Sequence, residues 1–294
     1  MNRPLTIACL QTRPMPDFDS AIAEALGLAR EAVESGAKLL CLPEYCGGLV
    51  TDGAVIRPPA APDGAHPVVD ALGRFASQAG VWIQIGSVAV AASDSESHSG
   101  PDSGPDDGII NRGYLLDNQG EVRARYDKIH MFDIQLSETE VYRESAFVRA
   151  GGAAVIEETP WAKVGHTICY DLRFPQLYRD LAQAGAEILT VPAAFTQKTG
   201  EAHWHVLNRA RAIENGAFVV AACAHGPCPG GGAAYGHSLI IDPWGEVLAD
   251  RGEGPGVAIA TIDLDAVSQA RAKIPSLTHD RAYARPDGYP KAAE

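Results

Sequence analysis

The chain has 294 residues, 46% of them hydrophobic and 21% charged, which is enough apolar material for one large domain and excludes a disordered chain. Its formal net charge of −13 gives it no electrostatic reason to bind nucleic acid or an anionic membrane surface. The same charge repels acidic substrates, so any such substrate needs basic groups within its site.

The six cysteines do not form the pattern of a disulfide framework in a chain of this length. Several stand in apolar runs such as TIACL, KLLCL and VVAAC, where a free thiol behaves as a small buried side chain. The N-terminal apolar stretch is too short for a signal peptide, and no apolar run approaches the ~18 residues that a membrane span needs. These features predict a cytoplasmic protein.

The first part of the chain alternates between strands and helices, which is typical of an α/β protein. The expected elements are strands at 4–11, 38–43 and 81–90, and helices from about Asp19 to a cap at Gly36 and at 67–78. Residues 91–110 are rich in Ser, Asp, Gly and Pro and carry five carboxylates without a basic residue. We expect a mobile acidic surface loop over 91–108 that keeps the protein soluble, with a functional acidic arm as the alternative.

The second part of the chain continues the α/β pattern without a change in composition, so residues 1–294 are predicted to form one domain. A polar tail, including 275–294, is expected after the last strand. The expected elements are strands at 111–117, 121–126, 153–158, 162–169, 187–192, 217–222 and 256–262, helices at 175–184 and 202–215, and two strands within 238–250 joined at Asp-Pro-Trp-Gly.

Three reactive side chains stand where predicted strands end, which is where catalytic groups gather in open α/β sheets. Glu44 follows KLLCLP, Lys128 follows the strand that ends at Tyr126, and Cys169 ends VGHTIC before a helix begins. Each has an ordinary alternative: Cys169 as inert packing, Glu44 as a surface carboxylate, and Lys128 as a solvated partner of Asp127.

The functional interpretation of these residues is nucleophilic catalysis. The strand-to-helix turn is similar to a nucleophile elbow, which exposes the Cys169 side chain and aims the backbone N–H of Tyr170 at an oxyanion. A thiol needs an adjacent base or cation to become nucleophilic at neutral pH. Glu44 would be a general base with a pKa raised by partial burial, and Lys128 a fixed cation for the oxyanion.

The chain resembles the nitrilase superfamily of carbon–nitrogen hydrolases over nearly its whole length. The matching segments are Leu-Pro-Glu-Tyr at 42–45, Lys-Ile-His-Met-Phe-Asp at 128–133 and Cys-Tyr-Asp-Leu-Arg-Phe-Pro at 169–175. The order Glu, Lys, Cys is that of the family, and the spacings 128 − 44 = 84 and 169 − 128 = 41 are similar to the family's. The resemblance implies that Glu44 is the base, Lys128 the oxyanion cation and Cys169 the nucleophile.

The family also uses a second glutamate between the lysine and the cysteine, which orients the lysine and the substrate. Glu144 in Tyr-Arg-Glu-Ser is the best match here, ahead of Glu138 and Glu140. The alternative for Glu144 is a salt bridge within a loop.

Further segments resemble the Nit branch of the superfamily, which contains deaminated-glutathione amidase and ω-amidase. They are Gly-Ala-Glu-Ile-Leu-Thr at 185–190, Ala-Phe-Thr at 194–196, the run at 199–207, Arg-Ala-Arg-Ala-Ile-Glu at 209–214 and Tyr-Gly-His-Ser at 235–238. YDLRFP, AHW and Asp-Pro-Trp-Gly favour the first enzyme, although Gln135–Tyr142 has no clear counterpart in it. N-carbamoyl-amino-acid hydrolase and nitrilase remain as alternatives.

The implied reaction cleaves a small linear amide to an acid and ammonia through a cysteine thioester. A substrate carboxylate would need a cation, and Arg173 is the first choice because guanidinium grips carboxylates with two hydrogen bonds. A structural pair of Arg173 with Asp171 is the alternative. Phe195, Thr196 and Trp204 are expected pocket walls, with core packing as the alternative for the two aromatic residues.

The resemblance implies a single-domain α/β fold, a four-layer α-β-β-α sandwich, and a homodimer formed through the helix at 175–184. It implies no organic cofactor and no metal. A zinc hydrolase is disfavoured because His203, His205, Cys41 and Cys46 do not form a His-Glu-x-x-His or Cys-x-x-Cys motif. A catalytically silent interaction protein is the non-enzymatic alternative, and it would be favoured by loss of the three catalytic residues, all of which are present.

Overall fold

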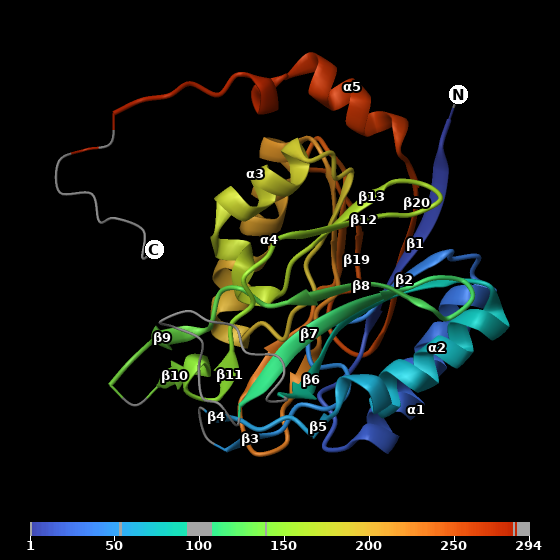
Figure 1. Cartoon of the computed structure of the whole chain (residues 1–294), viewed down its shortest axis with the longest axis vertical. Helices are drawn as coiled ribbons and strands as arrows, with labels where there is room; N and C mark the ends of the chain where they lie inside the picture. Colours follow the sequence, from blue (N-terminus) through green and yellow to red (C-terminus); the bar gives the residue numbers. More distant parts are fainter. Residues whose placement is uncertain (1, 53–54, 93–107, 139, 285, 287–294) are drawn as a thin grey trace.

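The computed structural model describes residues 2–52, 55–92, 108–138, 140–284 and 286. Its centre is a pair of β-sheets that lie face to face (Figure 1). The predicted strands of both halves of the chain are present, with boundaries shifted by a few residues, so the expected α/β class is confirmed.

The first sheet has eight strands in the order β11-β7-β6-β2-β1-β20, with β5 beside β6 and β8 beside β7. Strands β1, β2 and β6 pair in parallel, which is the βαβ arrangement that the N-terminal pattern predicts. Their bounds are β1 Pro4–Gln11, β2 Leu39–Cys41, β5 Ala60–Ala61, β6 Trp82–Ala91, β7 Ile109–Leu116, β8 Val122–Asp127, β11 Val148–Arg149 and β20 Gly256–Asp263.

The second sheet has six strands in the order β12-β13-β14-β15-β18-β19. Its central strands β13, β14 and β15 are parallel and are joined through helices, while the outer pairs are antiparallel. Their bounds are β12 Val155–Glu158, β13 Lys163–His166, β14 Ile188–Thr190, β15 Phe218–Ala221, β18 Leu239–Ile241 and β19 Val247–Asp250.

Helices α1 Phe18–Glu34 and α2 Pro67–Ala79 cover the outer face of the first sheet, and α3 Pro175–Gln183 and α4 Gln197–Asn215 cover that of the second. Helix α5 Asp265–Lys273 packs against the core between the sheets. Short elements complete the chain: β3 Thr51–Asp52, β4 Val55–Ile56, β9 Asp133–Gln135, β10 Val141–Arg143, β16 His225–Pro227, β17 Ala233–Tyr235, and the 3₁₀ turns η1 Asp63–Ala65, η2 Glu144–Ala146, η3 Cys169–Arg173 and η4 Ser276–Thr278.

Alternation along the strands assigns each side chain to a layer. On β1, Ala8 and Leu10 pack under α1 and α2, while Ile7 and Cys9 face the second sheet. The core between the sheets therefore differs from the two cores under the helices, and α3 and α4 cover the far face of the second sheet. The predicted four-layer α-β-β-α sandwich is confirmed.

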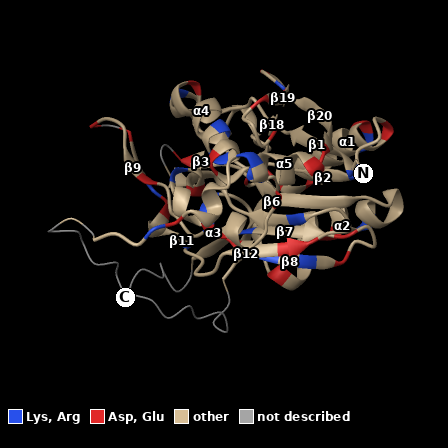
Figure 2. Ribbon diagram, turned by 90° about the horizontal axis from the view of Figure 1, so that it is seen from above, with Lys and Arg blue, Asp and Glu red and all other residues tan. Residues whose placement is uncertain are grey.

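Charges of both signs occur along the same elements, as the red and blue segments of β8 show (Figure 2). Within the described residues, no helix combines the length and the apolar character that crossing a membrane would require.

Helix α4 begins at Gln197, five residues before the predicted start at 202. Gly200 lies inside this early first turn, although glycine weakens helices. The structure explains it: a Cβ on Gly200 would stand 2.3 Å from Cγ of Tyr235, so only glycine lets the helix approach β17. The early start places the first turn of α4 at the cavity where the strands of the two sheets end.

Helix α5 corrects the expected polar tail, which was placed directly after the last strand. Its apolar positions are few, but Val267 and Ala270 are buried. The chain after α5 returns to α3, where Arg179 forms an ion pair with Asp280 (Figure 1). Most of the expected loop at 91–108 and the end of the tail at 275–294 lie outside the described residues.

Candidate active site

A cavity of ≈ 330 Å³ opens at the ends of the strands of both sheets. Glu44, Lys128, Glu144 and Cys169 all line it, so the structure brings the four sequence-predicted catalytic positions together. The first sheet supplies Glu44 after β2 and Lys128 after β8, and the second sheet supplies Cys169 after β13. The catalytic groups therefore meet only because the two sheets face each other.

Glu44 is 4% exposed, and both oxygens of its carboxylate accept hydrogen bonds from other parts of the protein. Oε1 accepts hydrogen bonds from Nζ of Lys128 at 2.9 Å and from Nδ2 of Asn111 at 2.9 Å. Oε2 accepts one from the backbone N–H of Ala194 at 3.0 Å, which belongs to the second sheet. A carboxylate with this many donors is held in one orientation and in its charged form.

Lys128 lies between two carboxylates. Its Nζ stands 2.9 Å from Oε1 of Glu44 and 2.8 Å from Oε2 of Glu144. The same Oε2 accepts the backbone N–H of Phe132 at 2.6 Å. Glu144 is thus part of a buried charge cluster, not of a surface loop, which supports the orienting role that the resemblance implies.

The burial of this cluster shifts its ionisation. Burial opposes the charge on Glu44, but the charge and the hydrogen bond of Lys128 outweigh it, so the pKa of Glu44 is lowered. The expected increase is therefore wrong in direction, because the sequence does not reveal how close the cation is. Burial raises the pKa of Glu144, and Glu44 adds to this effect. Burial disfavours the charge on Lys128, yet the two carboxylates raise its pKa, so it remains a cation.

Cys169 occupies a strained turn. Its φ is +49°, in the left-handed region that a residue with a side chain rarely adopts. The strand β13 ends at His166, three residues earlier than predicted, and η3 begins at Cys169 itself. The sharp turn expected of a nucleophile elbow is present, but the thiol is buried at the cavity, with 7% of the residue exposed, and does not stand on the surface.

The thiol of Cys169 and the carboxylate of Glu44 line the same cavity, and each shifts the pKa of the other. Burial and the nearby charge of Glu44 raise the pKa of Cys169 well above its ordinary value. The resting group is therefore a neutral thiol beside an ionised carboxylate. This arrangement suits transfer of the thiol proton to Glu44 at the moment of attack.

Asp171 joins the turn of Cys169 to the strand that leads to Lys128. The sequence analysis considered Asp171 only as a structural partner of Arg173. Its Oδ2 accepts the hydroxyl of Tyr126 at 2.7 Å and the backbone N–H of Ile168 at 2.8 Å. Its position two residues after the nucleophile in CYDLRFP was the only sequence signal for it.

Two further residues were missed. Asn111 is fully buried and bonds Glu44, and Tyr45 bonds Glu144 at 3.4 Å from a left-handed backbone with φ +51°. A buried amide at the start of a predicted strand and a tyrosine directly after the predicted base were the available signals.

The predicted substrate residues divide into two groups. Tyr170, Phe195 and Thr196 line the cavity. Trp204 is fully buried, donates its indole N–H to the backbone oxygen of His237 at 2.7 Å, and packs against Phe195. Trp204 therefore packs behind the cavity wall and does not itself line the cavity.

Arg173 is also absent from the described residues that line the cavity. Its guanidinium lies 5.4 Å from the ring centre of Phe195 and 3.3 Å from Nδ1 of His203, and its expected partner Asp171 is bonded elsewhere. The role of Arg173 in substrate binding stays a prediction.

The cavity wall includes residues for which the sequence offered no signal. Glu140 and Tyr142 come from the segment at 135–142, which does border the site, as expected. Lys198, from the early first turn of α4, is the additional cation on the described wall, and its Nζ lies 3.9 Å from Glu140. Cys228 also lines the cavity, whereas Cys46 belongs to the core under α1 and α2.

A cysteine beside a Glu–Lys–Glu cluster, where two facing α/β sheets meet, defines a nitrilase-type hydrolase. Comparison with known proteins agrees: residues 6–272 match the carbon–nitrogen hydrolase family, and the chain belongs to it. It is therefore a hydrolase of carbon–nitrogen bonds other than peptide bonds. The resemblance stated from the sequence is confirmed.

Individual relatives are similar over most of the chain. The deaminated glutathione amidase of Mus musculus is 38% identical over 282 residues, which is 95% of this chain and 83% of that protein. The structure of Saccharomyces cerevisiae Nit3, a member of branch 10 of the nitrilase superfamily, has a TM-score of 0.81 at 25% identity and covers 96% of this chain and 97% of that one.

A bacterial amidase gives a third comparison. The amidase from Nesterenkonia sp. AN1 has a TM-score of 0.68 at 25% identity, covers 92% of this chain and 98% of its own, and carries acrylamide added at its active-site cysteine.

Proposed function

We propose that this protein hydrolyses a small carboxylate-bearing amide, with deaminated glutathione as the preferred substrate. The observation that carries the proposal is that Cys169 and Glu44 line one cavity, in which the carboxylate of Glu44 shares Lys128 with that of Glu144. The names of relatives at 38% identity support the substrate. ω-Amidase, N-carbamoyl-amino-acid hydrolase and nitrilase activities are the enzymatic alternatives.

In the first half of the reaction, Glu44 takes the proton of Cys169 while the sulfur adds to the amide carbonyl. Lys128 and the backbone N–H of Tyr170 stabilise the oxyanion, and Glu144 holds Lys128 in place. The protonated Glu44 then gives its proton to the leaving nitrogen as the carbon–nitrogen bond breaks. The product of this half is a thioester on Cys169 and a free amine or ammonia.

In the second half, the ionised Glu44 takes a proton from water, whose oxygen adds to the thioester carbonyl. The same donors stabilise the second oxyanion, which collapses to release the acid and the thiol. Covalent catalysis divides one difficult hydrolysis into two steps with lower barriers. The position of Glu44 between the thiol and the cation allows one carboxylate to act in both halves.

The nature of the leaving group depends on the substrate. In deaminated glutathione the amide nitrogen belongs to a cysteine residue, so hydrolysis there releases an amine, whereas a primary amide releases ammonia. Ammonia, the product expected from the sequence, therefore applies only to primary amides such as α-ketoglutaramate.

A substrate carboxylate needs a cation on the wall, because the protein has a net charge of −13. Lys198 is placed for this role, since it lines the cavity and its Nζ lies as far as 3.9 Å from the carboxylate of Glu140. Thr196, bonded to Thr199 at 2.7 Å, lies in the same turn of the chain. We assign the carboxylate contact to Lys198 in preference to Arg173.

The test is product release by the purified protein and by Cys169→Ala. The panel is deaminated glutathione, α-ketoglutaramate, an N-carbamoyl amino acid and a simple nitrile, with both the acid and the amine or ammonia measured by mass spectrometry. We expect the highest kcat/KM on deaminated glutathione and none in the variant. Activity confined to another member of the panel would transfer the proposal to that substrate class, and silence from a folded protein would favour a non-catalytic interaction role.

We also propose a homodimer through α3. Helix α4 packs against α3 and carries two of the most exposed large apolar side chains, Val206 at 68% and Ile213 at 51% exposed, which supports a wider contact surface. Light scattering after size exclusion tests it: a monomeric mass would contradict it, and Val206→Glu is expected to weaken the dimer. A cytoplasmic location is supported by the free state of all six cysteines.

A further inference from the structure

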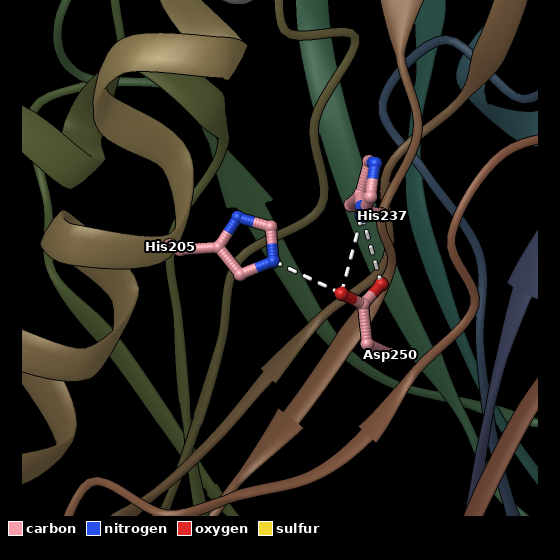
Figure 3. A group of neighbouring side chains, drawn as sticks. All are labelled: His205, His237 and Asp250. Atoms are coloured by element: carbon pink, nitrogen blue, oxygen red, sulfur yellow. Dashed lines mark hydrogen bonds and ion pairs between the residues drawn. The ribbon is translucent and has the colours of Figure 1, made fainter.

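Two histidines and an aspartate meet on the second sheet, apart from the catalytic cavity. His205 lies on α4, His237 between β17 and β18, and Asp250 at the end of β19. Each offers one ligand atom, and these atoms all lie within 4.8 Å of one another. Figure 3 shows both imidazole rings directed at the carboxylate. Among the described residues that line the catalytic cavity, none belongs to this trio.

The distances show how closely the three groups converge. Nε2 of His205 lies 3.0 Å from Oδ2 of Asp250, and Nδ1 of His237 lies 3.0 Å from Oδ1 of the same carboxylate (Figure 3). A zinc ion bound at ~2.0–2.2 Å from each ligand keeps its ligand atoms ~3.3–3.5 Å apart. The three groups therefore need only small rotations to surround one ion.

The group is held in place by contacts that a chance surface cluster does not need. His237 has a left-handed backbone with φ +52°, which is uncommon for a residue other than glycine. Its backbone N–H donates to the oxygen of Gly252 at 3.0 Å, and its own oxygen accepts the indole N–H of Trp204 at 2.7 Å. The buried Trp204, directly before His205, thus links two of the three ligands.

The side chains themselves are also oriented. The ring of Tyr235 stacks on that of His237 with centroids 4.7 Å apart, and the ring of His205 packs edge-on against His237 at 5.2 Å. The backbone N–H of Gly252 donates to Oδ1 of Asp250 at 2.8 Å. Ring packing and a hydrogen bond to the carboxylate are the supports that metal ligands in proteins usually have.

We propose that His205, His237 and Asp250 form a binding site for a divalent transition-metal ion, with zinc as the expected occupant. Two imidazoles and one carboxylate are a donor set that zinc prefers, and Asp250 supplies the negative charge. The side chains are 25–35% exposed, so a water molecule can complete the coordination. The neighbouring cation Arg251 is held by the backbone oxygens of Glu253 and Pro255.

Bound metal would cross-link α4 to β19 and to the segment before β18. Trp204 packs against Phe195 on the cavity wall and bonds the backbone oxygen of His237, so the proposed metal site adjoins a residue that supports the catalytic cavity. The metal site shares no residue with the proposed reaction, which uses Cys169, Glu44, Lys128, Glu144 and the backbone N–H of Tyr170.

The test measures zinc binding by calorimetry in a Cys169→Ala background, which removes the catalytic thiol as a competing ligand. We expect one zinc ion per chain, and a loss of at least about tenfold in affinity for His205→Gln and for Asp250→Asn. His237→Asn is the third variant, because asparagine tolerates the left-handed backbone. His279→Gln removes another exposed imidazole far along the chain and serves as the matched control, with unchanged affinity.

A second readout guards against variants that bind less because they fold less. Zinc should raise the melting temperature of the parent and of His279→Gln, and not of the three ligand variants, when the metal-free melting temperatures agree. Cobalt bound in place of zinc should give tetrahedral d–d absorption without sulfur charge transfer. The proposal is overturned if the parent binds no zinc, or if the ligand variants bind it as tightly as the parent does.

Discussion

Two clusters of charged and ionisable side chains in this protein are built from similar parts and differ in burial. In the catalytic cluster, the side chains of Glu44, Lys128 and Glu144 are 4%, 2% and 1% exposed. In the cluster of His205, His237 and Asp250, the exposed fractions are 25–35%. Both bring together residues that are distant in sequence, and both contain short hydrogen bonds to carboxylate oxygens.

The difference teaches that burial makes charges depend on one another. A buried charge that loses its partner cannot turn to water, so the penalty falls on the groups that remain. At the surface water replaces a lost partner, and an ion pair contributes little. Substitutions in the catalytic cluster should therefore change activity and folding together, whereas those in the histidine cluster should change only ligand binding.

The largest effect is expected for Cys169→Ala, because it removes the atom that forms the thioester. Loss of a nucleophile in covalent hydrolases costs about 10⁴- to 10⁶-fold in kcat. The melting temperature should stay close to that of the parent, and steady-state kinetics with circular dichroism check both. Cys46→Ala, which removes another buried thiol, is the control and should keep its activity.

Glu44→Gln should lower kcat by about 10²- to 10⁴-fold, since the amide cannot accept the thiol proton. Steady-state kinetics at saturating substrate measure this loss, and a kcat close to that of the parent would mean that another group takes the proton.

Lys128→Met tests whether a buried charge depends more strongly on its partner than an exposed charge does. It leaves Glu44 and Glu144 buried without their cation, so the free energy of unfolding should fall by about 3–5 kcal/mol. Lys198→Met, at an exposed lysine on the same cavity, should change it by less than about 0.5 kcal/mol. Urea denaturation of the two variants measures the difference, and equal values would remove the distinction between buried and exposed charges here.

The fall of kcat/KM on the acidic side of its pH profile should occur at low pH. Burial opposes ionisation of Glu44, but Lys128 lowers its pKa below the ordinary 4.5, and the ionised form is the base. The stabilisation of the ionised group is present above pH 4.5 and is lost as the pH falls through the lowered pKa of the folded protein. A profile from about pH 4 to 8, with circular dichroism at each point, tests this; a limb near pH ~6 would assign the base to another group.

The smallest effect is expected for Lys198→Gln. It should raise KM about two- to fivefold for an amide with a carboxylate, which is the scale of an exposed ion pair, and leave an uncharged amide unaffected. Lys163→Gln, at an exposed lysine of β13, is the matched control. An equal rise in KM with both substrates would mean that Lys198 contributes to packing of the cavity wall and not to binding of the carboxylate.

By itself the sequence predicted the α/β class and put forward Glu44, Lys128 and Cys169 as candidates, which the family resemblance then singled out as a catalytic set. These features depend on short-range order, since periodicity marks strands and helices and the catalytic side chains follow the strand ends within short motifs. The resemblance supplied the four-layer architecture and the second glutamate, Glu144.

Only the tertiary structure decided the rest. Whether the pKa of Glu44 rises or falls depends on the 2.9 Å contact with a lysine 84 positions away. That Lys198 lines the cavity depends on Gly200, which lets α4 start early against Tyr235. The histidine cluster spans separations of 237 − 205 = 32 and 250 − 237 = 13 residues, which match no short motif. In each case the physical quantity is a distance through space, which local patterns in the chain do not encode.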